Sequence, residues 1–138
     1  MSGRTDGRYH VGMIVLAHGI DMVDCRRLAE AIERHGDRFL RRVFTDAELA
    51  YADARRRRIE HLAGRFAVKE AVMKALGTGW AGGITWHDIE TVNEPSGQPR
   101  VRLTGRCRQL ADQRACADIL VSISHIDTHA IASAIAVG

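Results

Sequence analysis

The stretch FAVKEAVMKALGTG, Phe66 to Gly79, decides the fold of this chain, because it has the pattern of a buried helix that ends at a glycine turn. With 3.6 residues per turn, apolar side chains cover nearly every face of this helix, yet its middle carries Lys69, Glu70 and Lys74. A buried carboxylate needs a cation, a metal or hydrogen bonds. Glu70 is therefore either half of a structural ion pair with Lys74 or part of a functional site.

The segments around this helix predict a mixed fold. The helix itself is predicted from about Ile59 to Leu76, with Gly77 as a stop signal. The other predicted elements are a strand at 13–23, a helix at 24–35 that ends at Gly36, a short helix that starts at the Thr45/Glu48 capping box, strand-like pieces at 84–93 and 100–105, a helix at 106–114, and strands at 118–125 and 129–137. Without βαβ regularity, this order predicts an α+β fold with a mostly antiparallel sheet packed on the long central helix.

Length and composition bound the class of protein. The 138 residues suit one domain, which we expect at 11–138 after a polar, flexible extension at 1–10. No stretch approaches the roughly 18 apolar residues of a membrane span, and no signal peptide precedes the first strand. The three cysteines lack C-x-x-C spacing, which argues against disulfides and structural zinc. A cytoplasmic, soluble protein is expected.

The arginines suggest an acidic partner. The net charge is only +3, but the arginines are unevenly placed, with a block at 55–58 and six more between residues 26 and 42. Nucleic acid is disfavoured because the chain has no basic-aromatic binding motif. A solvated basic surface and a basic binding module without catalysis remain alternatives, although the binding module has no need of a carboxylate inside the apolar helix.

Four blocks in order identify a family. GID at 19–21, LAGRFAVKEAVMKALGTG at 62–79, WHDIE at 86–90 and SISH at 122–125 closely resemble the holo-acyl-carrier-protein synthases, the short bacterial class of 4'-phosphopantetheinyl transferases. The resemblance covers residues 13–137 and rests mainly on the central block. It implies the fold of that family and its reaction: the phosphopantetheine arm of coenzyme A is transferred to a serine of apo acyl carrier protein, which releases adenosine 3',5'-bisphosphate and supports fatty acid biosynthesis.

The resemblance gives the charges of the central helix a role. Asp21 and Glu70 match the two metal-binding carboxylates of the family, and two acids suffice for Mg²⁺ because water and phosphate oxygens fill its other positions. Lys74 matches the lysine that contacts phosphate. The base that deprotonates the serine is either a metal-bound water or Glu70.

The resemblance also implies the coenzyme A contacts. His125 is expected beside the phosphates and is counted with Glu70 and Lys74 as catalytic. The two basic positions expected around the 3'-phosphate are Arg65 and, with a register ambiguous by one residue, Arg57. The turn after the central helix is expected to let backbone approach the nucleotide, and it consists of Gly77, Thr78 and Gly79.

The partners follow from the same resemblance. Arg27, Arg34 and Arg38 resemble the basic face on which the acidic carrier protein docks. The short class is trimeric with sites between subunits, so Asp21, Glu70 and Lys74 are expected from one chain and part of the nucleotide pocket from its neighbour. A transferase for another carrier, such as one in polyketide synthesis, stays open, as do the tolerance for acyl-coenzyme A and the choice between Mg²⁺ and Mn²⁺.

Two residues depart from the family pattern. His18 stands where a small or apolar residue is more common, and His129 replaces a common tyrosine. Because side chains alternate along a strand, His18 is expected on the face opposite Asp21, where it changes packing and leaves the chemistry intact.

Overall fold

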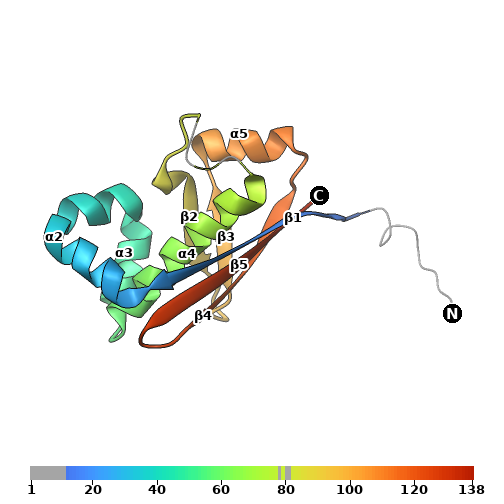
Figure 1. Cartoon of the computed structure of the whole chain (residues 1–138). Helices are drawn as coiled ribbons and strands as arrows, with labels where there is room; N and C mark the ends of the chain where they lie inside the picture. Colours follow the sequence, from blue (N-terminus) through green and yellow to red (C-terminus); the bar gives the residue numbers. More distant parts are fainter. Residues whose placement is uncertain (1–11, 78, 80–81) are drawn as a thin grey trace, which may run out of the picture.

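A long helix lies along one face of a three-stranded sheet in the computed structural model, which describes residues 12–77, 79 and 82–138 (Figure 1). The helix is α4 (Arg58–Leu76), and the sheet has the strand order β1 (Val15–Asp24), β5 (His129–Val137), β4 (Asp118–His125). A hairpin of β2 (Ile89–Asn93) and β3 (Pro99–Leu103) forms a separate two-stranded sheet. All pairings are antiparallel, so the predicted α+β class is confirmed, with two sheets in place of one.

The central strand β5 presents alanines to α4. Ala130, Ala132, Ala134 and Ala136 are all buried on the helix side, and the residues between them face the other way. On β1 the corresponding position is Gly19, where an added Cβ would lie 2.0 Å from the carbonyl oxygen of Ala71. Small side chains on these two strands therefore let the backbone of α4 approach the sheet closely.

The helix α2 (Cys25–Val43) is longer than predicted. Its N-cap is Asp24, whose carboxylate accepts hydrogen bonds from the backbone N–H groups of Arg26 at 2.9 Å and Arg27 at 3.2 Å. The predicted break at Gly36 is confirmed, because Gly36 leaves the helical conformation at φ 61° and ψ −144°; a second helical segment, which was not predicted, follows it to Val43. Leu40 and Val43 are buried in the core, and their packing restores the helix beyond the break.

The remaining helices lie beside α4. The helix α3 (Asp46–Asp53) begins with the predicted capping box of Thr45 and Glu48, and α4 ends at Gly77, which takes a left-handed conformation. A 3₁₀ turn, η1 (Trp86–Asp88), precedes β2, and α5 (Gly105–Gln113) follows β3. The extension expected at 1–10 lies outside the described residues.

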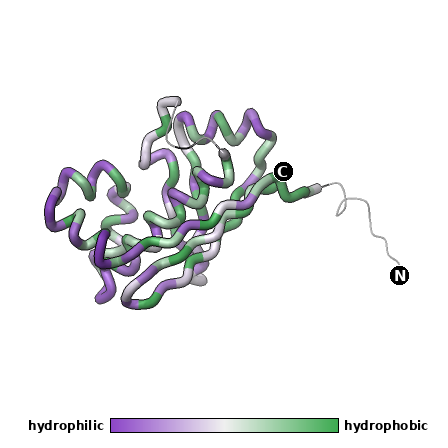
Figure 2. Tube along the Cα trace, in the orientation of Figure 1, coloured by the Kyte–Doolittle hydropathy of each residue, from purple (hydrophilic) through white to green (hydrophobic). Residues whose placement is uncertain are grey.

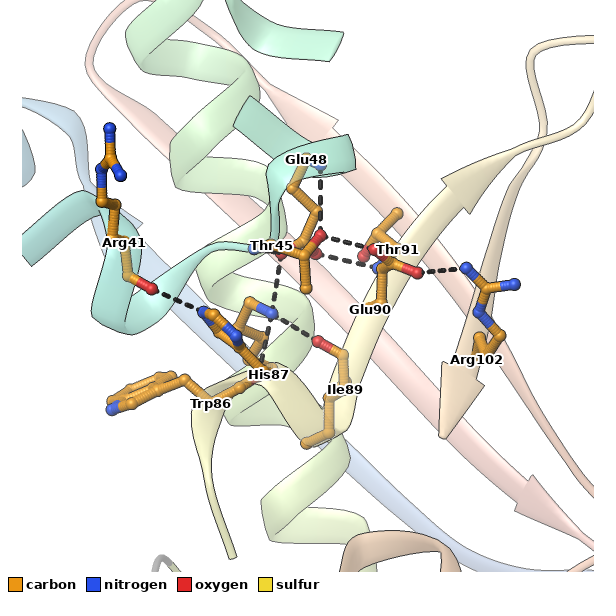
Figure 3. A network of polar contacts seen from close by, with 10 residues as sticks. Arg41, Thr45, Glu48, Trp86, His87, Ile89, Glu90, Thr91 and Arg102 are labelled. Atoms are coloured by element: carbon orange, nitrogen blue, oxygen red, sulfur yellow. Dashed lines mark hydrogen bonds and ion pairs between the residues drawn. The ribbon is translucent and has the colours of Figure 1, made fainter. Parts of the chain in front are cut away.

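A fully buried ion pair answers part of the question raised by the charges of α4. Lys69 and Glu48 are both completely buried, with Nζ 2.9 Å from Oε1 (Figure 3). Lys69 also donates to the carbonyl oxygens of Trp86 and Ile89, and Glu48 accepts from the backbone N–H of Thr91 at 2.9 Å. The most buried charge of the helix is thus Lys69, and it joins α4 to α3 and β2.

The buried apolar side chains form one core cluster that includes much of α4. The segment that leads into β1 is also hydrophobic (Figure 2). Among the described residues, no helix has both the length and the hydrophobicity that a membrane crossing requires.

Candidate active site

A groove of about 600 Å³ between β1, α2 and α4 contains both predicted metal-binding carboxylates. Asp21 enters it from β1 because it shares the helix-facing side of the strand with Gly19 and Val23. Glu70 enters it from α4 and is partly exposed. The apolar side of the groove consists of Met22, Val23, Leu28, Ala31, Phe39 and Phe66. Asp21, Glu70 and the N-cap residue Asp24 therefore stand beside a surface suited to the uncharged part of a ligand.

Lys74 lies at the edge of the same site. Its ammonium is 2.9 Å from Oδ1 of Asp21 and donates to the backbone carbonyl of Ile20 at 3.0 Å. Its side chain is 56% exposed, so its charge also remains accessible to a ligand. Gly77 and Gly79 follow directly at the end of α4, and Thr78, predicted with them, lies outside the described residues. The predicted carboxylates and the predicted phosphate lysine are thus brought together.

Arg65 and His125 line a smaller pocket of about 140 Å³, and His125 also borders a hollow that it shares with Met22 and His129 of the first groove. The pocket is formed by the first turns of α4, the tip of the β2–β3 hairpin and the end of β4, and it is lined by Tyr51, Glu60, His61, Gly64, Arg65, Asn93, Gly97, Pro99, Ile123 and His125. Within one chain the predicted site is therefore divided between a carboxylate groove and a second pocket, which we call the arginine pocket.

Arg65 is held rigidly in the arginine pocket. Its side chain donates to Oδ1 of Asn93, and its guanidinium lies 3.9 Å over the ring centre of Tyr51. Arg65 is only 3% exposed, and burial lowers the pKa of its guanidinium, which nevertheless stays charged. Its buried Nε has no hydrogen-bond partner among the described residues. An anion in the pocket would supply the missing acceptor.

His125 is held by a carboxylate. Its Nδ1 lies 2.7 Å from Oε1 of Glu60, and Arg57 is 3.7 Å from the same oxygen. The ring of His61 meets that of His125 edge to face at a centroid distance of 5.3 Å. Burial, followed by the charge of His125, lowers the pKa of His61. Arg57, predicted at the nucleotide, is 69% exposed at the N-cap of α4, outside the lining of the pocket.

Four residues of the arginine pocket were missed by the sequence analysis: Tyr51, Glu60, His61 and Asn93. The available signal was the spacing of Arg57, His61 and Arg65, which are four residues apart and share one face of a helix. Asn93 and Tyr51 come from other elements, and only the tertiary fold brings them to Arg65.

The predicted docking arginines lie on α2. Arg27 lines the carboxylate groove, and Arg34 and Arg38 are exposed. The break at Gly36 lies between Arg34 and Arg38. Helical spacing therefore does not place all three arginines on one face of α2. The block at 55–58 is partly engaged locally: Arg55 lies 3.4 Å over the ring of Tyr51, and Arg58 is 2.6 Å from Asp53.

The two departures from the family pattern have clear positions. His18 is exposed on the outer face of the sheet, opposite Asp21 as predicted, with Nε2 3.3 Å from Oγ of Ser133. His129 lines the carboxylate groove, where its Nε2 lies 3.9 Å from the Asp24 carboxylate. The pKa of Asp24 is lowered mainly by the hydrogen bond from the backbone N–H of Arg27, and the charge of His129 contributes further.

Comparisons with known proteins agree with this geometry. Residues 17–134 match the family model described as "4'-phosphopantetheinyl transferase superfamily". The chain is 48% identical over 125 residues to a holo-[acyl-carrier-protein] synthase of Desulforudis audaxviator, covering 91% of this chain and 95% of the relative.

Two solved structures are also similar. The holo-[acyl-carrier-protein] synthase of Neisseria meningitidis has a TM-score of 0.82 at 25% identity, over 89% of this chain and 98% of that one. The Helicobacter pylori enzyme, solved in complex with coenzyme A, has a TM-score of 0.76 at 28% identity, over 86% and 98% of the two chains. The chain therefore belongs to the 4'-phosphopantetheinyl transferase superfamily and, within it, to the holo-[acyl-carrier-protein] synthases.

Proposed function

We propose that this enzyme transfers the 4'-phosphopantetheine group of coenzyme A to a serine of apo acyl carrier protein in a Mg²⁺-dependent reaction that supports fatty acid biosynthesis. The observation that carries the proposal is the meeting of Asp21 and Glu70 in one groove, with Lys74 at its edge. Coenzyme A in the complex of the Helicobacter pylori relative supports the choice of substrate.

The groove fits a Mg²⁺ ion by its donor set. No group of three or more His, Cys, Asp or Glu side chains is placed for a metal among the described residues, but Mg²⁺ commonly takes only one or two carboxylates. Asp21 and Glu70 would hold the ion, which when bound would neutralise diphosphate charge and polarise the reacting phosphoryl group.

The chain's own side chains account for the rest of the transfer. The serine oxygen forms a bond to the phosphorus that carries the pantetheine arm, the bond from that phosphorus to the second phosphate breaks, and adenosine 3',5'-bisphosphate leaves. Lys74 offsets the charge that develops on the phosphates. Glu70 is the protein group proposed to accept the serine proton. The apolar side of the groove binds and orients the pantetheine arm.

The division of the site supports an assembly in which neighbouring chains complete each other. The outer face of the sheet exposes Leu16, Ile20, Met22 and Leu120, at 39%, 50%, 62% and 53%. An apolar face of this kind favours association, and we propose a homotrimer in which the carboxylate groove of one subunit meets the arginine pocket of the next. Arg65 and His125 would then bind the phosphates of the nucleotide half of coenzyme A.

The basic face of α2 is proposed to dock the acidic carrier protein. Arg27 lines the groove itself, and Arg34 and Arg38 extend positive charge along the exposed side of the helix. The cytoplasm is the proposed compartment, and the three buried, free cysteines are compatible with its reducing conditions.

Mass spectrometry of the carrier protein tests the function directly. The purified enzyme is incubated with apo acyl carrier protein, coenzyme A and Mg²⁺, with parallel reactions for Glu70→Gln, for a chelator and for Asp112→Asn on the exposed side of α5. We expect the carrier to gain one phosphopantetheine with the wild type and with Asp112→Asn, and none in the other two reactions. No gain with a panel of fatty acid and polyketide carriers would reject the proposal in favour of a basic binding protein.

A further inference from the structure

The hydrogen bond between Glu60 and His125 engages one nitrogen of the imidazole and leaves the other available to a ligand. Oε1 of Glu60 lies 2.7 Å from Nδ1 of His125, and an ionised carboxylate can only accept a hydrogen bond. Nδ1 therefore carries the proton, and Nε2 is the atom left for a ligand. We propose that Glu60 is a positioning residue for coenzyme A binding, one that acts through His125. This inference rests on the proposed function.

Glu60 is well placed for such a role because it cannot easily move. It lies in the first turn of α4 and is only 8% exposed, although glutamate is usually found at the surface. Arg57, one turn earlier, lies 3.7 Å from the oxygen that binds His125. The negative charge of Glu60 is thus held between a cation and the imidazole, in a position set by the helix backbone.

His61 braces the imidazole from another direction. Its ring packs edge to face against His125 at 5.3 Å and against Tyr51 at 5.5 Å. Burial lowers the pKa of His61, which favours its neutral ring. The Glu60 carboxylate and the ring of His61 together restrict the rotation of the His125 side chain. The imidazole is therefore preorganised for a ligand.

The pocket that His125 faces is built for an anion. Arg65 also lines this pocket and is only 3% exposed. Its Nε has no hydrogen-bond partner among the described residues. A phosphate oxygen would satisfy that N–H, and a phosphate oxygen at Nε2 of His125 needs the imidazolium form, which donates from both nitrogens. The carboxylate of Glu60 binds Nδ1 and so keeps Nε2 of His125 available for that phosphate oxygen.

A double-mutant cycle separates this role from a general structural one. Coenzyme A binding is measured by calorimetry for Glu60→Ala, His125→Ala and the double variant, with Asp112→Ala as the surface control. We expect Glu60→Ala to weaken binding about tenfold, roughly 1.4 kcal/mol, in the wild-type background and to have almost no effect in the His125→Ala background. Equal losses in both backgrounds, or no loss in either, would overturn the proposal.

Glu60→Gln provides a conservative rescue. Its amide oxygen can accept the Nδ1–H bond without the negative charge, so this variant is expected to bind coenzyme A more tightly than Glu60→Ala and more weakly than the wild type. A Gln variant no better than Ala would contradict positioning through the hydrogen bond.

The ring state can be observed without any catalysis. Long-range ¹H–¹⁵N NMR of the wild type at about pH 8, where free imidazole is neutral, should show His125 with the proton on Nδ1, and Glu60→Gln should keep that tautomer. A wild-type His125 protonated on Nε2 alone would sink the idea even if Glu60→Ala failed to fold. If the tautomer is as expected but no carrier is modified, the proposed function fails and the positioning of His125 stands.

Discussion

The charges of α4 illustrate how single residues of one helix reach different partners. Lys69 is buried against Glu48, Arg65 stacks on Tyr51, and Lys74 pairs with Asp21 across to β1. The sequence predicts that charges in an apolar helix need partners, but it does not say which partners. Glu48 in particular reads as a capping-box residue only, whereas its carboxylate serves both the cap and the core ion pair.

Replacing Lys69 by methionine, which has a similar size, should nevertheless lower the stability of the protein strongly. Lys69→Met leaves the Glu48 carboxylate buried without its cation and removes the donor to the carbonyls of Trp86 and Ile89, so we expect a loss of about 3–5 kcal/mol in the free energy of unfolding. Urea denaturation measures it. The control is Lys74→Met on the same helix, with a side chain 56% exposed, for which the loss should stay below about 1 kcal/mol. Similar losses for both variants would contradict the importance of the buried pair.

At the scale of elements, the position of the groove depends on how closely β1 approaches α4. Alternation along β1 is enough to predict that Asp21 faces the helix. The approach itself cannot be predicted from the strand, because it depends on the backbone of a helix some fifty residues later, against which Gly19 leaves no room for a Cβ. The same limit explains why the second segment of α2 was not predicted: Gly36 ends the first segment as expected, and the packing of Leu40 and Val43 supports a further helical segment beyond it.

Gly19→Ala should therefore separate the strand from the helix. The new methyl would lie 2.0 Å from the Ala71 oxygen and 2.7 Å from the Ala75 nitrogen, and neither backbone atom can move without shifting α4. We expect a loss of about 1–3 kcal/mol in unfolding free energy. We also expect transferase activity to fall at least tenfold, because Asp21 is two residues away on the same face. A Gly19→Ala enzyme with wild-type activity would refute the close-approach argument.

The attachment of β2 to α3 should weaken in acid. Burial tends to raise the pKa of Glu90, but hydrogen bonds from Thr45 at 2.5 Å and Arg102 at 2.6 Å, with the nearby positive charges, together lower it (Figure 3). A carboxylate with a lowered folded pKa adds stability above its unfolded value, near 4.5, and that contribution is lost as the pH falls through the folded pKa.

The measurement is the unfolding free energy from about pH 6 to about pH 3, with Glu90→Gln beside the wild type. The difference between the two proteins should be largest at the upper end and shrink as the pH falls. Glu94→Gln, on the exposed turn of the same hairpin, controls for the loss of one carboxylate. A difference that is constant across this range would mean that the charge of Glu90 does not support the contact.

For the whole molecule, the important feature is that the predicted site residues occupy two separate hollows. The four sequence blocks predict the site residues and indicate the family, and the central block alone predicts the helix that carries most of these residues. They do not reveal that Glu70 and His125 face different cavities of one chain, because that separation depends on how the sheet is placed against α4.

Mixing two inactive variants tests whether neighbouring chains complete one site. Asp21→Asn damages the carboxylate groove, and His125→Ala damages the arginine pocket. Each should be inactive by itself. After co-refolding, activity should return in about a quarter of the sites, because a site then combines an intact groove with an intact pocket at random. Ile20→Glu, on the exposed outer face, should yield a folded protein that light scattering shows to be monomeric. This monomer should be inactive. A mixture without activity would place the complete site within one chain.

The two faces of β5 impose opposite demands on sequence change. On the inner face, a row of buried alanines sets the distance to α4, so any larger side chain there would disturb the helix that bears the groove. On the outer face, Ile131, Ser133 and Ile135 are only half-buried and touch no part of either hollow. The inner face of the strand therefore fixes the carboxylate groove within one chain, and changes on the outer face would decide whether that groove meets the arginine pocket of a neighbouring chain.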